Sequence, residues 1–450
     1  MIYILILLIL LYSRTFNYKK IIDDNVPRSG YLREMTTQAI DYKFYEQIRP
    51  KMYFITNLFT LYGACLGVYL LWGLRPALLY ALMPLNVEAG CWSVGNMYMT
   101  TVLFILTAYY FLITYTWGFI VSLIFYHFAL HSTVSAIPYA FFVLFLDLPY
   151  PAITSWEVKA LHFLVLALFL LGERFQGGLK QRVARHKDLD IKSVTADPSR
   201  VFVMIKVIGY YIYLCCWPSR LGFFHQFGKE GNKKGQLHKP NRMFWLMLCL
   251  IITFSALLIQ LPQGIYLLLW FFLFIGVFGQ FVQYGQFICE RYIHIPLIAY
   301  CVAITHITTH VLPPQTYIIL ATLYFYRSHI YIPSWKNNMT LFSQSFSAFP
   351  YAEENANNLA RWYVEHGQMP QAINLFNIAL NLTQGNRYNL LCNLVGCYQD
   401  IQRYDLALEC LEKVMKIAPE SKKKELLEHH ITLSRKLLRT NRMIKQMRAI

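Results

Sequence analysis

Charged residues are scarce in this sequence of 450 residues. Asp, Glu, Lys and Arg together make up 14% of it, against about 25% in an ordinary soluble domain, and this scarcity excludes a soluble globular enzyme. The sequence also lacks any CxxC pair, and its cysteines lie mostly inside apolar runs, which argues against a zinc site and a disulfide framework. Hydrophobic residues instead make up 56% and aromatic residues 16%. Because aromatic rings anchor spans at both membrane interfaces, the composition predicts an all-α, polytopic membrane protein.

Acidic residues are in the minority, with 24 Asp and Glu against 41 Lys and Arg and a net charge of +17. In a soluble protein this balance would suggest a nucleic-acid partner, but the sequence contains no recognition module that would present a basic face. The basic residues crowd two segments between apolar runs, 174–200 and 220–242, where the positive-inside rule and anionic headgroups favour them. We therefore expect the charge to set membrane topology and predict no nucleic-acid partner.

The apolar runs give a count of membrane spans. The first run, residues 2–12, has neither a basic flank nor a small-residue cleavage site, so it predicts a first span or signal anchor. A polar loop, 19–51, separates it from the others. These recur roughly at 52–74, 77–92, 98–117, 119–148, 158–172, 201–217, 243–261, 264–288, 295–312 and 314–332. The 119–148 run suits one tilted span or two short ones broken at Pro138, so we predict about 11 or 12 spans.

A different pattern begins after Pro333. Apolar runs stop there, and small and large residues follow the periodicity of tetratricopeptide repeats, in which two antiparallel helices interlock. Ala372 and Ala407 occupy equivalent positions 35 residues apart, close to the ~34-residue period of such repeats. Two repeats and a helix over 420–439 predict a small α-solenoid whose last helix caps the exposed apolar face. We therefore predict a membrane domain over 1–333 and a helical repeat domain over 334–450.

An adjacent pair of acids, Asp23 and Asp24, follows the first apolar run. At the membrane surface, one carboxylate could take the proton from an acceptor hydroxyl as a phosphate leaves the anomeric carbon of a sugar. The second could orient the first, raise its pKa by like-charge repulsion, or hold a divalent cation such as Mg²⁺ or Mn²⁺. Adjacent acids are also common in solvated loops, and that alternative stays open. No other cofactor or metal site is predicted.

Glu88 is a candidate substrate-binding residue. It follows Pro84 in an interrupted apolar segment, with Trp92 beyond it. A carboxylate at membrane depth is costly in free energy and therefore suggests a function. The alternative is that the segment ends at Pro84 and Glu88 already lies in water.

Two more clusters stand beside apolar runs. Glu290, Arg291 and Tyr292 lie between two of them, where Arg291 could bind a phosphate bidentately; the alternative is a Glu–Arg pair that only neutralises itself. His225 follows the 201–217 run together with other polar residues. It is a second candidate for binding at the interface, and a positive-inside anchor is the alternative there.

The order of these features along the chain is itself informative. They run in the sequence Asp23-Asp24, Pro84 to Glu88 with Trp92 and Gly95, Pro138 ahead of Leu146-Asp147-Leu148, Pro218 near Leu221, Glu290-Arg291-Tyr292 with Pro296, and the terminal repeats. In that order they resemble the transmembrane and tetratricopeptide-repeat O-mannosyltransferases and their microbial relatives, within the GT-C glycosyltransferases. The resemblance covers nearly the whole chain and depends on the order of individually weak motifs.

The resemblance implies transfer of a mannose-like hexose from a polyprenyl-phosphate donor to Ser or Thr hydroxyls of proteins. It places the first loop and the repeats on the non-cytoplasmic face of the endoplasmic reticulum or bacterial inner membrane. Asp24 or Asp23 then corresponds to the base, with Asp24 favoured, and Glu88 and the Glu290-Arg291-Tyr292 motif correspond to family motifs. The repeats would bind the acceptor polypeptide.

The sequence departs from the family pattern at several positions. Met83 and Asn86 stand where histidines are usual, Asn96 and Tyr98 where Arg and Asp often follow, His131 and Ser132 in place of a Lys-Glu pair, and His294 in place of a Tyr. The predicted function is an integral-membrane protein O-glycosyltransferase. One alternative, which the missing polar residues permit, is a catalytically degraded membrane scaffold whose repeats bind a partner protein. Another is a transporter of lipid-linked sugar, but no internal repeat of the membrane part supports it.

Overall fold

The computed structural model of the chain describes residues 1–18, 52–92, 95–146, 156–175, 199–227, 238–280, 288–383, 385 and 387–448. These residues form 19 α-helices and several short 3-10 helices, and no β-strand occurs among them, which confirms the all-α prediction for this part of the chain. Two compact units are present. The first comprises Met1–Phe223 and Lys233–Thr340, and the second comprises Phe224–Asn232 and Leu341–Ile450.

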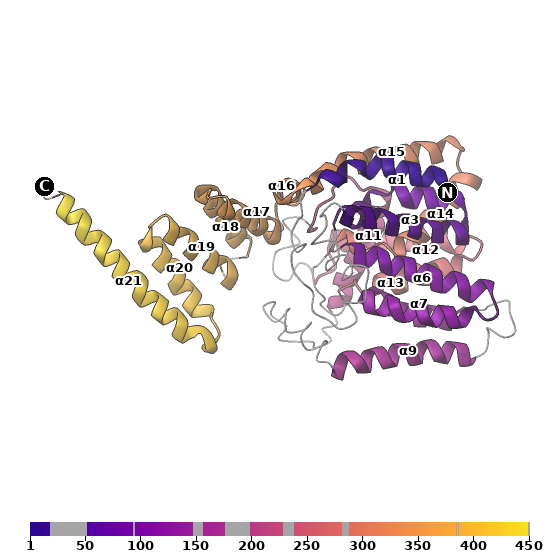
Figure 1. Ribbon diagram of the computed structural model, residues 1–450, viewed down its shortest axis with the longest axis horizontal. Helices are drawn as coiled ribbons and strands as arrows, with labels where there is room; N and C mark the ends of the chain where they lie inside the picture. Colours follow the sequence, from indigo (N-terminus) through magenta and orange to yellow (C-terminus); the bar gives the residue numbers. More distant parts are fainter. Residues whose placement is uncertain are drawn as a thin grey trace. The chain divides into compact units, whose positions relative to one another are not determined.

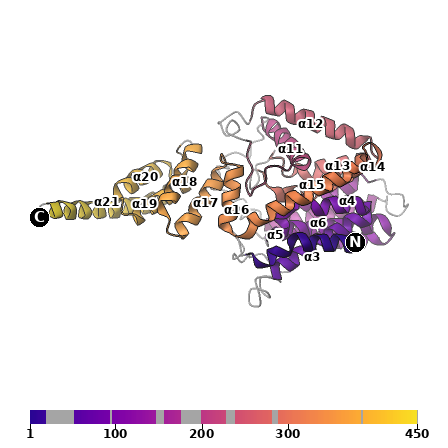
Figure 2. The same ribbon diagram turned by 90° about the horizontal axis from the view of Figure 1, so that it is seen from above.

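The first unit contains α-helices, most of them labelled in Figure 1, and short 3-10 helices. Its α-helices are α1 (Ile2–Tyr12), α3 (Met52–Trp72), α4 (Leu74–Leu82), α5 (Val87–Cys91), α6 (Asn96–Thr114), α7 (Gly118–Ser132), α8 (Pro138–Leu144), α9 (Trp156–Phe175), α11 (Arg200–Cys216), α12 (Arg242–Ile259), α13 (Gly264–Gly276), α14 (Pro296–His310) and α15 (Gln315–Tyr331). The 3-10 helices are η1 (Ser13–Asn17), η4 (Pro84–Asn86), η5 (Val134–Ala136), η6 (Glu290–Tyr292) and η7 (Ile332–Lys336). Seen from above, α11 and α12 lie on one side of this unit and α1 and α3 on the other (Figure 2).

Three of the described helices are long and apolar enough to cross a membrane. They are Ile55–Trp72 within α3, Asn96–Thr114 and Arg242–Ile259. Shorter apolar helices are Ile2–Thr15, Gly118–Ser132, Val134–Leu144 and Gly264–Gly276. The wider count of 11 or 12 spans stays a prediction.

Some apolar runs that look continuous in the sequence are divided in the structure. In the 119–148 run, Thr133 is extended (φ −151, ψ 158) and separates α7 from η5, and Pro138 begins α8. In the 77–92 run, Met83 is extended and separates α4 from η4, which Pro84 begins. Proline suits the first turn of a helix because it has no N–H to donate there. Hydropathy alone therefore cannot tell one long helix from two short ones.

Close backbone contact holds α11 and α12 together. A Cβ added to Gly209 of α11 would lie 2.5 Å from Cβ and 2.8 Å from the carbonyl oxygen of Met247 in α12. Small residues at helix contacts permit this approach, which maximises van der Waals packing. Glycine at this position therefore sets the distance between the two helices.

The second unit is a run of helices that pack in succession. It contains α16 (Asn338–Ala348) from Leu341 on, α17 (Glu353–Glu365), α18 (Met369–Leu382), α19 (Tyr388–Asp400), α20 (Tyr404–Ile417) and α21 (Glu420–Arg448). Buried small residues, Ala356, Ala360, Ala372 and Ala379, let α17 and α18 pack closely. The side-chain amide of Asn355 donates to the carbonyl oxygens of Phe224 and Ser345, both 3.1 Å away, and so holds the 224–227 segment in this unit.

Candidate functional site

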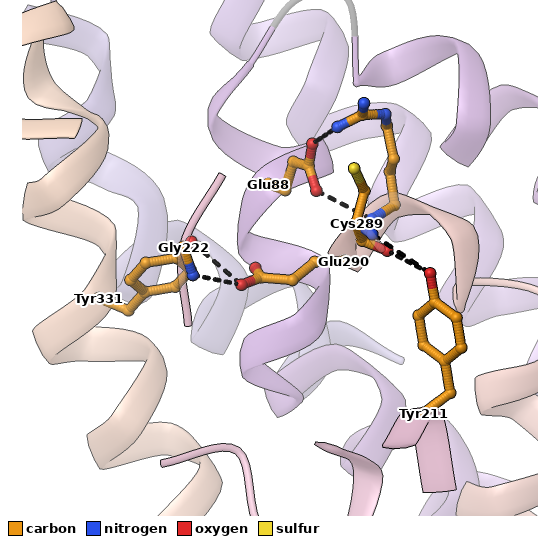
Figure 3. A network of polar contacts seen from close by, with 7 residues as sticks. Glu88, Tyr211, Gly222, Cys289, Glu290 and Tyr331 are labelled. Carbon is orange, nitrogen blue, oxygen red and sulfur yellow. Dashed lines mark hydrogen bonds and ion pairs between the residues drawn. The ribbon is translucent and has the colours of Figure 1, made fainter. Parts of the chain in front are cut away.

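A buried ion pair joins two distant parts of the first unit. Glu88 lies in the first turn of α5, and Arg291 lies in η6; their side chains pair although 203 positions separate them. The backbone N–H of Arg291 also donates to Oε2 of Glu88 at 2.9 Å. Glu88 is 0% and Arg291 6% exposed. Since a buried charge is tolerated only when it is paired and hydrogen-bonded, these two contacts fix η6 against α5 (Figure 3).

Aromatic rings surround the guanidinium of Arg291. Its Cζ lies 5.2 to 5.8 Å from the ring centroids of Trp92, Tyr98, Phe223 and Tyr292. A cation within about 6 Å of a ring face is attracted by the ring quadrupole. The rings also hold one another, since Trp92 meets Phe223 edge-on at 5.3 Å between centroids. The cage therefore stabilises the buried guanidinium and fixes its orientation.

Glu290 is held by different partners. Its Oε1 accepts from the backbone N–H of Gly222 at 2.8 Å and from the hydroxyl of Tyr331 at 3.2 Å. Figure 3 shows its side chain directed toward these two residues. Burial raises the pKa of Glu290 to about 8, because desolvation disfavours the charged carboxylate. The two acids thus differ in their partners, since Glu88 pairs with Arg291 and Glu290 accepts from a backbone N–H and a tyrosine hydroxyl.

The backbone before η6 is held by Tyr211 of α11. The Tyr211 hydroxyl donates to the carbonyl oxygen of Cys289 and accepts from the N–H of Cys289, both at 3.2 Å (Figure 3). One hydroxyl therefore satisfies both backbone groups of a buried residue, as buried polar groups require. This arrangement orients the chain that enters the Glu290-Arg291-Tyr292 segment.

Asn86 and His294, two positions where the sequence departs from the glycosyltransferases it resembles, contact each other. Nδ1 of His294 lies 2.8 Å from Oδ1 of Asn86, whose Nδ2 donates to the carbonyl oxygen of Tyr80 at 2.6 Å. Burial, reinforced by the charge of Arg291, lowers the pKa of His294 to about 3. The imidazole is therefore neutral, and its Nδ1–H donates to Asn86. Since Nδ1 holds the proton, Nε2 of His294 is the acceptor.

Several buried polar atoms near the ion pair have no hydrogen-bond partner within the part of the chain that the structure describes. They are the hydroxyl of Tyr12, Nε1 of Trp92, Nδ2 of Asn96 and Nε2 of His294. All four residues are at most 4% exposed. Buried polar groups in proteins are more than 90% paired, and an unpaired one costs about 1–3 kcal/mol. The N–H groups of Trp92 and Asn96 are donors, Nε2 of His294 is an acceptor, and the Tyr12 hydroxyl can be either. Donors of this kind can bind phosphate oxygens, and donors and acceptors together can bind sugar hydroxyls.

Five of the residues predicted to bind substrate are close together in the first unit. Glu88, Trp92, Arg291 and Tyr292 share the ion pair and its cage, and Glu290 adjoins them. The sixth, His225, belongs to the second unit, where its ring packs on Phe349 at 4.4 Å between centroids. The predicted catalytic pair, Asp23 and Asp24, lies outside the described residues.

Sequence reasoning missed Tyr211, Phe223 and Tyr331. Tyr211 and Tyr331 lie within apolar runs, where one tyrosine among many carries no signal of its own. Phe223 lies between Pro218 and His225, in a segment whose polar residues drew attention. The sequence did not indicate that the ring of Phe223 contacts Arg291.

No group of three or more His, Cys, Asp or Glu side chains among the described residues is arranged to hold a metal ion. Comparisons with protein-family models, with curated proteins and with solved structures give no match for this chain.

Proposed function

We propose that the chain is a multi-pass membrane glycosyltransferase that moves a mannose-like hexose from a polyprenyl-phosphate donor to Ser or Thr hydroxyls of proteins. The observation that carries the proposal is the Arg291 site. A permanently charged guanidinium is buried in an aromatic cage, and unpaired polar atoms on Trp92, Asn96 and His294 lie on the residues around it. Guanidinium recognises phosphate oxygens, and aromatic rings with a few polar atoms are the usual lining of a ligand site.

The reaction is a substitution at the anomeric carbon. The acceptor oxygen forms a bond to that carbon, the bond from carbon to phosphate oxygen breaks, and the electron pair leaves with the phosphate. A carboxylate of the Asp23-Asp24 pair takes the proton of the acceptor hydroxyl, which contributes about 10²–10⁴ in rate. Arg291 stabilises the negative charge that develops on the departing phosphate, and Glu88 holds Arg291 in place for this role.

The membrane carries the substrate in this proposal. Each buried CH₂ of a polyprenyl chain is worth about 0.8 kcal/mol, so the donor cannot leave the bilayer and the enzyme must act at its surface. Three helices with the length and apolarity of membrane spans support a membrane location. We infer that the shorter apolar helices complete a GT-C-like polytopic bundle, with the first loop and the repeats on the non-cytoplasmic side.

The acceptor polypeptide would bind the second unit, which we infer to be a tetratricopeptide solenoid. Gly367 and Gln402 have left-handed backbones, with φ of 71° and 61°, and stand 35 residues apart, like Ala372 and Ala407. Asn393 of α19 donates to Asn357 of α17 at 3.2 Å, so the first helices of the two expected repeats contact each other. Repeated turns at one spacing are typical of solenoids, whose concave surfaces bind extended peptides.

The test is glycosyl transfer by membranes that contain the full chain, supplied with a polyprenyl-phosphate-linked hexose and a Ser/Thr peptide. Replacing both acids, Asp23→Asn with Asp24→Asn, is expected to lower the rate by about a hundredfold or more. Asp41→Asn, which removes an acid from the same loop, is the matched control and should transfer normally. Transfer at the native rate by the double variant would refute the catalytic assignment. Unchanged Ser/Thr glycopeptides in cells without the chain would favour the scaffold instead.

A further inference from the structure

The last helix of the second unit, α21, has an uneven distribution of charge. Its acids are confined to the first third, and no Asp or Glu follows Glu428 in the sequence. Six bases then follow, which are Arg435, Lys436, Arg439, Arg442, Lys445 and Arg448. Bases in the last turn complement the helix macrodipole, but that effect fades beyond one turn. The bases of α21 begin well before its last turn, so the macrodipole does not account for them.

The first part of α21 packs on its neighbours through one face. Leu426 and Leu433 are buried, His429 lies 2.8 Å from the side-chain amide of Gln399 in α19, and Lys436 lies over the ring of Tyr404 in α20. Beyond this contact, six of the seven side chains of residues 438–444 are exposed. Both views show this end of the helix extending past α20 (Figures 1 and 2).

A second face of α21 combines exposed apolar and basic side chains. Leu427, Ile431, Arg435, Leu438 and Arg442 recur at intervals of three or four residues, which places them on one side of a helix; we call them the outer stripe. Leu427 is 49%, Ile431 43% and Leu438 59% exposed. Large apolar side chains exposed along one face mark an interaction surface.

The composition of the outer stripe favours one occupant. Amphipathic helices with leucine or isoleucine on one face and Lys or Arg around it lie in the membrane interface, where apolar side chains enter the acyl boundary and bases meet anionic headgroups. Each base near such a surface strengthens binding about fivefold, from about 1 kcal/mol. A nucleic acid would also attract the bases, but its phosphate backbone gives Leu427, Ile431 and Leu438 nothing to bury. The same chain has three helices that are long and apolar enough to cross a membrane, so a lipid bilayer is the surface that we expect this chain to meet.

We propose that the outer stripe of α21 binds the anionic surface of the lipid bilayer, with Leu427, Ile431 and Leu438 inserted among the headgroups and Arg435 and Arg442 on their phosphates. This attachment goes beyond the transferase proposal and does not depend on it. It requires only that the chain is embedded in a membrane.

The test compares hydrogen–deuterium exchange of residues 434–448 in the full chain, reconstituted in nanodiscs of phosphatidylcholine alone or mixed with phosphatidylglycerol. Slower exchange is expected in the anionic discs, and added salt should reduce the difference because it screens the charges. Arg442→Glu is expected to lower this protection about fivefold or more, and Leu438→Asp should also lower it. Lys416→Glu reverses an exposed charge on α20 and should leave it unchanged.

Equal exchange in both kinds of disc would overturn the proposal. So would protection that an oligonucleotide confers and anionic lipid does not, or protection that Arg442→Glu and Leu438→Asp leave intact. Exchange of residues 353–382, which form α17 and α18, reports whether each variant is folded. Glycosyl transfer by the same discs is measured separately, so a failure of either proposal leaves the other standing.

Discussion

Replacing Glu88 by glutamine is expected to destabilise the first unit near the site. The substitution keeps an acceptor for the backbone N–H of Arg291 but leaves the guanidinium, which is only 6% exposed, without its counter-charge. Breaking a buried ion pair by removing one partner costs about 3–5 kcal/mol. The cation–π contacts of the aromatic cage, each worth about 0.5–2 kcal/mol, are present before and after the substitution and therefore leave this difference unchanged.

Two native cysteines report on this cost from within the site. Cys91 ends the helix that carries Glu88, and Cys289 precedes Glu290; both are buried. Their rates of reaction with a thiol reagent, followed by mass spectrometry, measure local opening. A loss of about 3 kcal/mol predicts labelling more than about a hundredfold faster in Glu88→Gln. Cys397 is buried in the second unit and should label at the native rate.

The double variant Glu88→Gln with Arg291→Met separates charge from packing. Because replacing a whole buried pair by apolar groups is often neutral, it should label more slowly than Glu88→Gln alone. Arg291→Lys keeps the charge but loses the planar fork, and it should fall between the native chain and Glu88→Gln. Native labelling rates at Cys91 and Cys289 in both single variants would refute the claim that a buried, charged pair holds η6 on α5.

Two further predictions follow from the first unit. Because the pKa of Glu290 is raised from its ordinary 4.5 to about 8, the folded chain keeps a proton that the unfolded chain releases. The free energy of unfolding should therefore fall between about pH 4.5 and 8, by at most about 1.4 kcal/mol per pH unit. In Glu290→Gln, thermal unfolding should depend less on pH across that window, and an unaltered pH dependence would contradict the assignment. Gly209→Ala should lower the free energy of unfolding by about 1–3 kcal/mol, because the added Cβ meets Met247. The control is Gly276→Ala, whose Cβ meets nothing within 4 Å and should be tolerated. Equal losses in the two variants would exclude the close contact of α11 and α12.

Part of the composition of the site could be predicted from the sequence, but the contacts between its residues could not. Glu88 and Arg291 are conspicuous because charged residues are rare in apolar surroundings. The sequence predicts a phosphate-binding role for Arg291 and leaves a pair with its neighbour Glu290 as the alternative; the structure pairs Arg291 with Glu88 instead. Adjacent residues in a 3-10 turn point in different directions, since its side chains repeat every three residues. Which acid reaches the guanidinium therefore depends on how η6 and α5 pack, and no local pattern records that.

The fold shows the same division between local and distant information. Helical structure could be predicted for the described residues because hydropathy and helix length are local properties. The break of the 119–148 run into two short helices was one of the alternatives, and Pro138 begins the second helix. The close contact of Gly209 with Met247 joins residues far apart in the sequence, and no local pattern predicts it. The packing of α17 on α18 was easier to predict, because the two helices are neighbours along the chain and the sequence pattern occurs twice.

One helix shows why the site can depend on residues that have no chemical role. Four polar side chains of α15 lie on one face at intervals of three or four residues: Tyr324, Arg327, Ser328 and Tyr331. Their acceptors are the carbonyl oxygens of Cys215, Pro218 and Leu82 and the carboxylate of Glu290. These acceptors lie in three segments of the site. Leu82 precedes η4, Cys215 and Pro218 precede Gly222, and Glu290 lies in η6. Since a hydrogen bond missing from a buried group costs about 1–3 kcal/mol, the register of α15 sets the positions of all three segments together. The apolar run over 314–332 that predicts a simple span therefore also holds the residues that place Glu290 and, through Gly222, the neighbouring ring of Phe223 against Arg291.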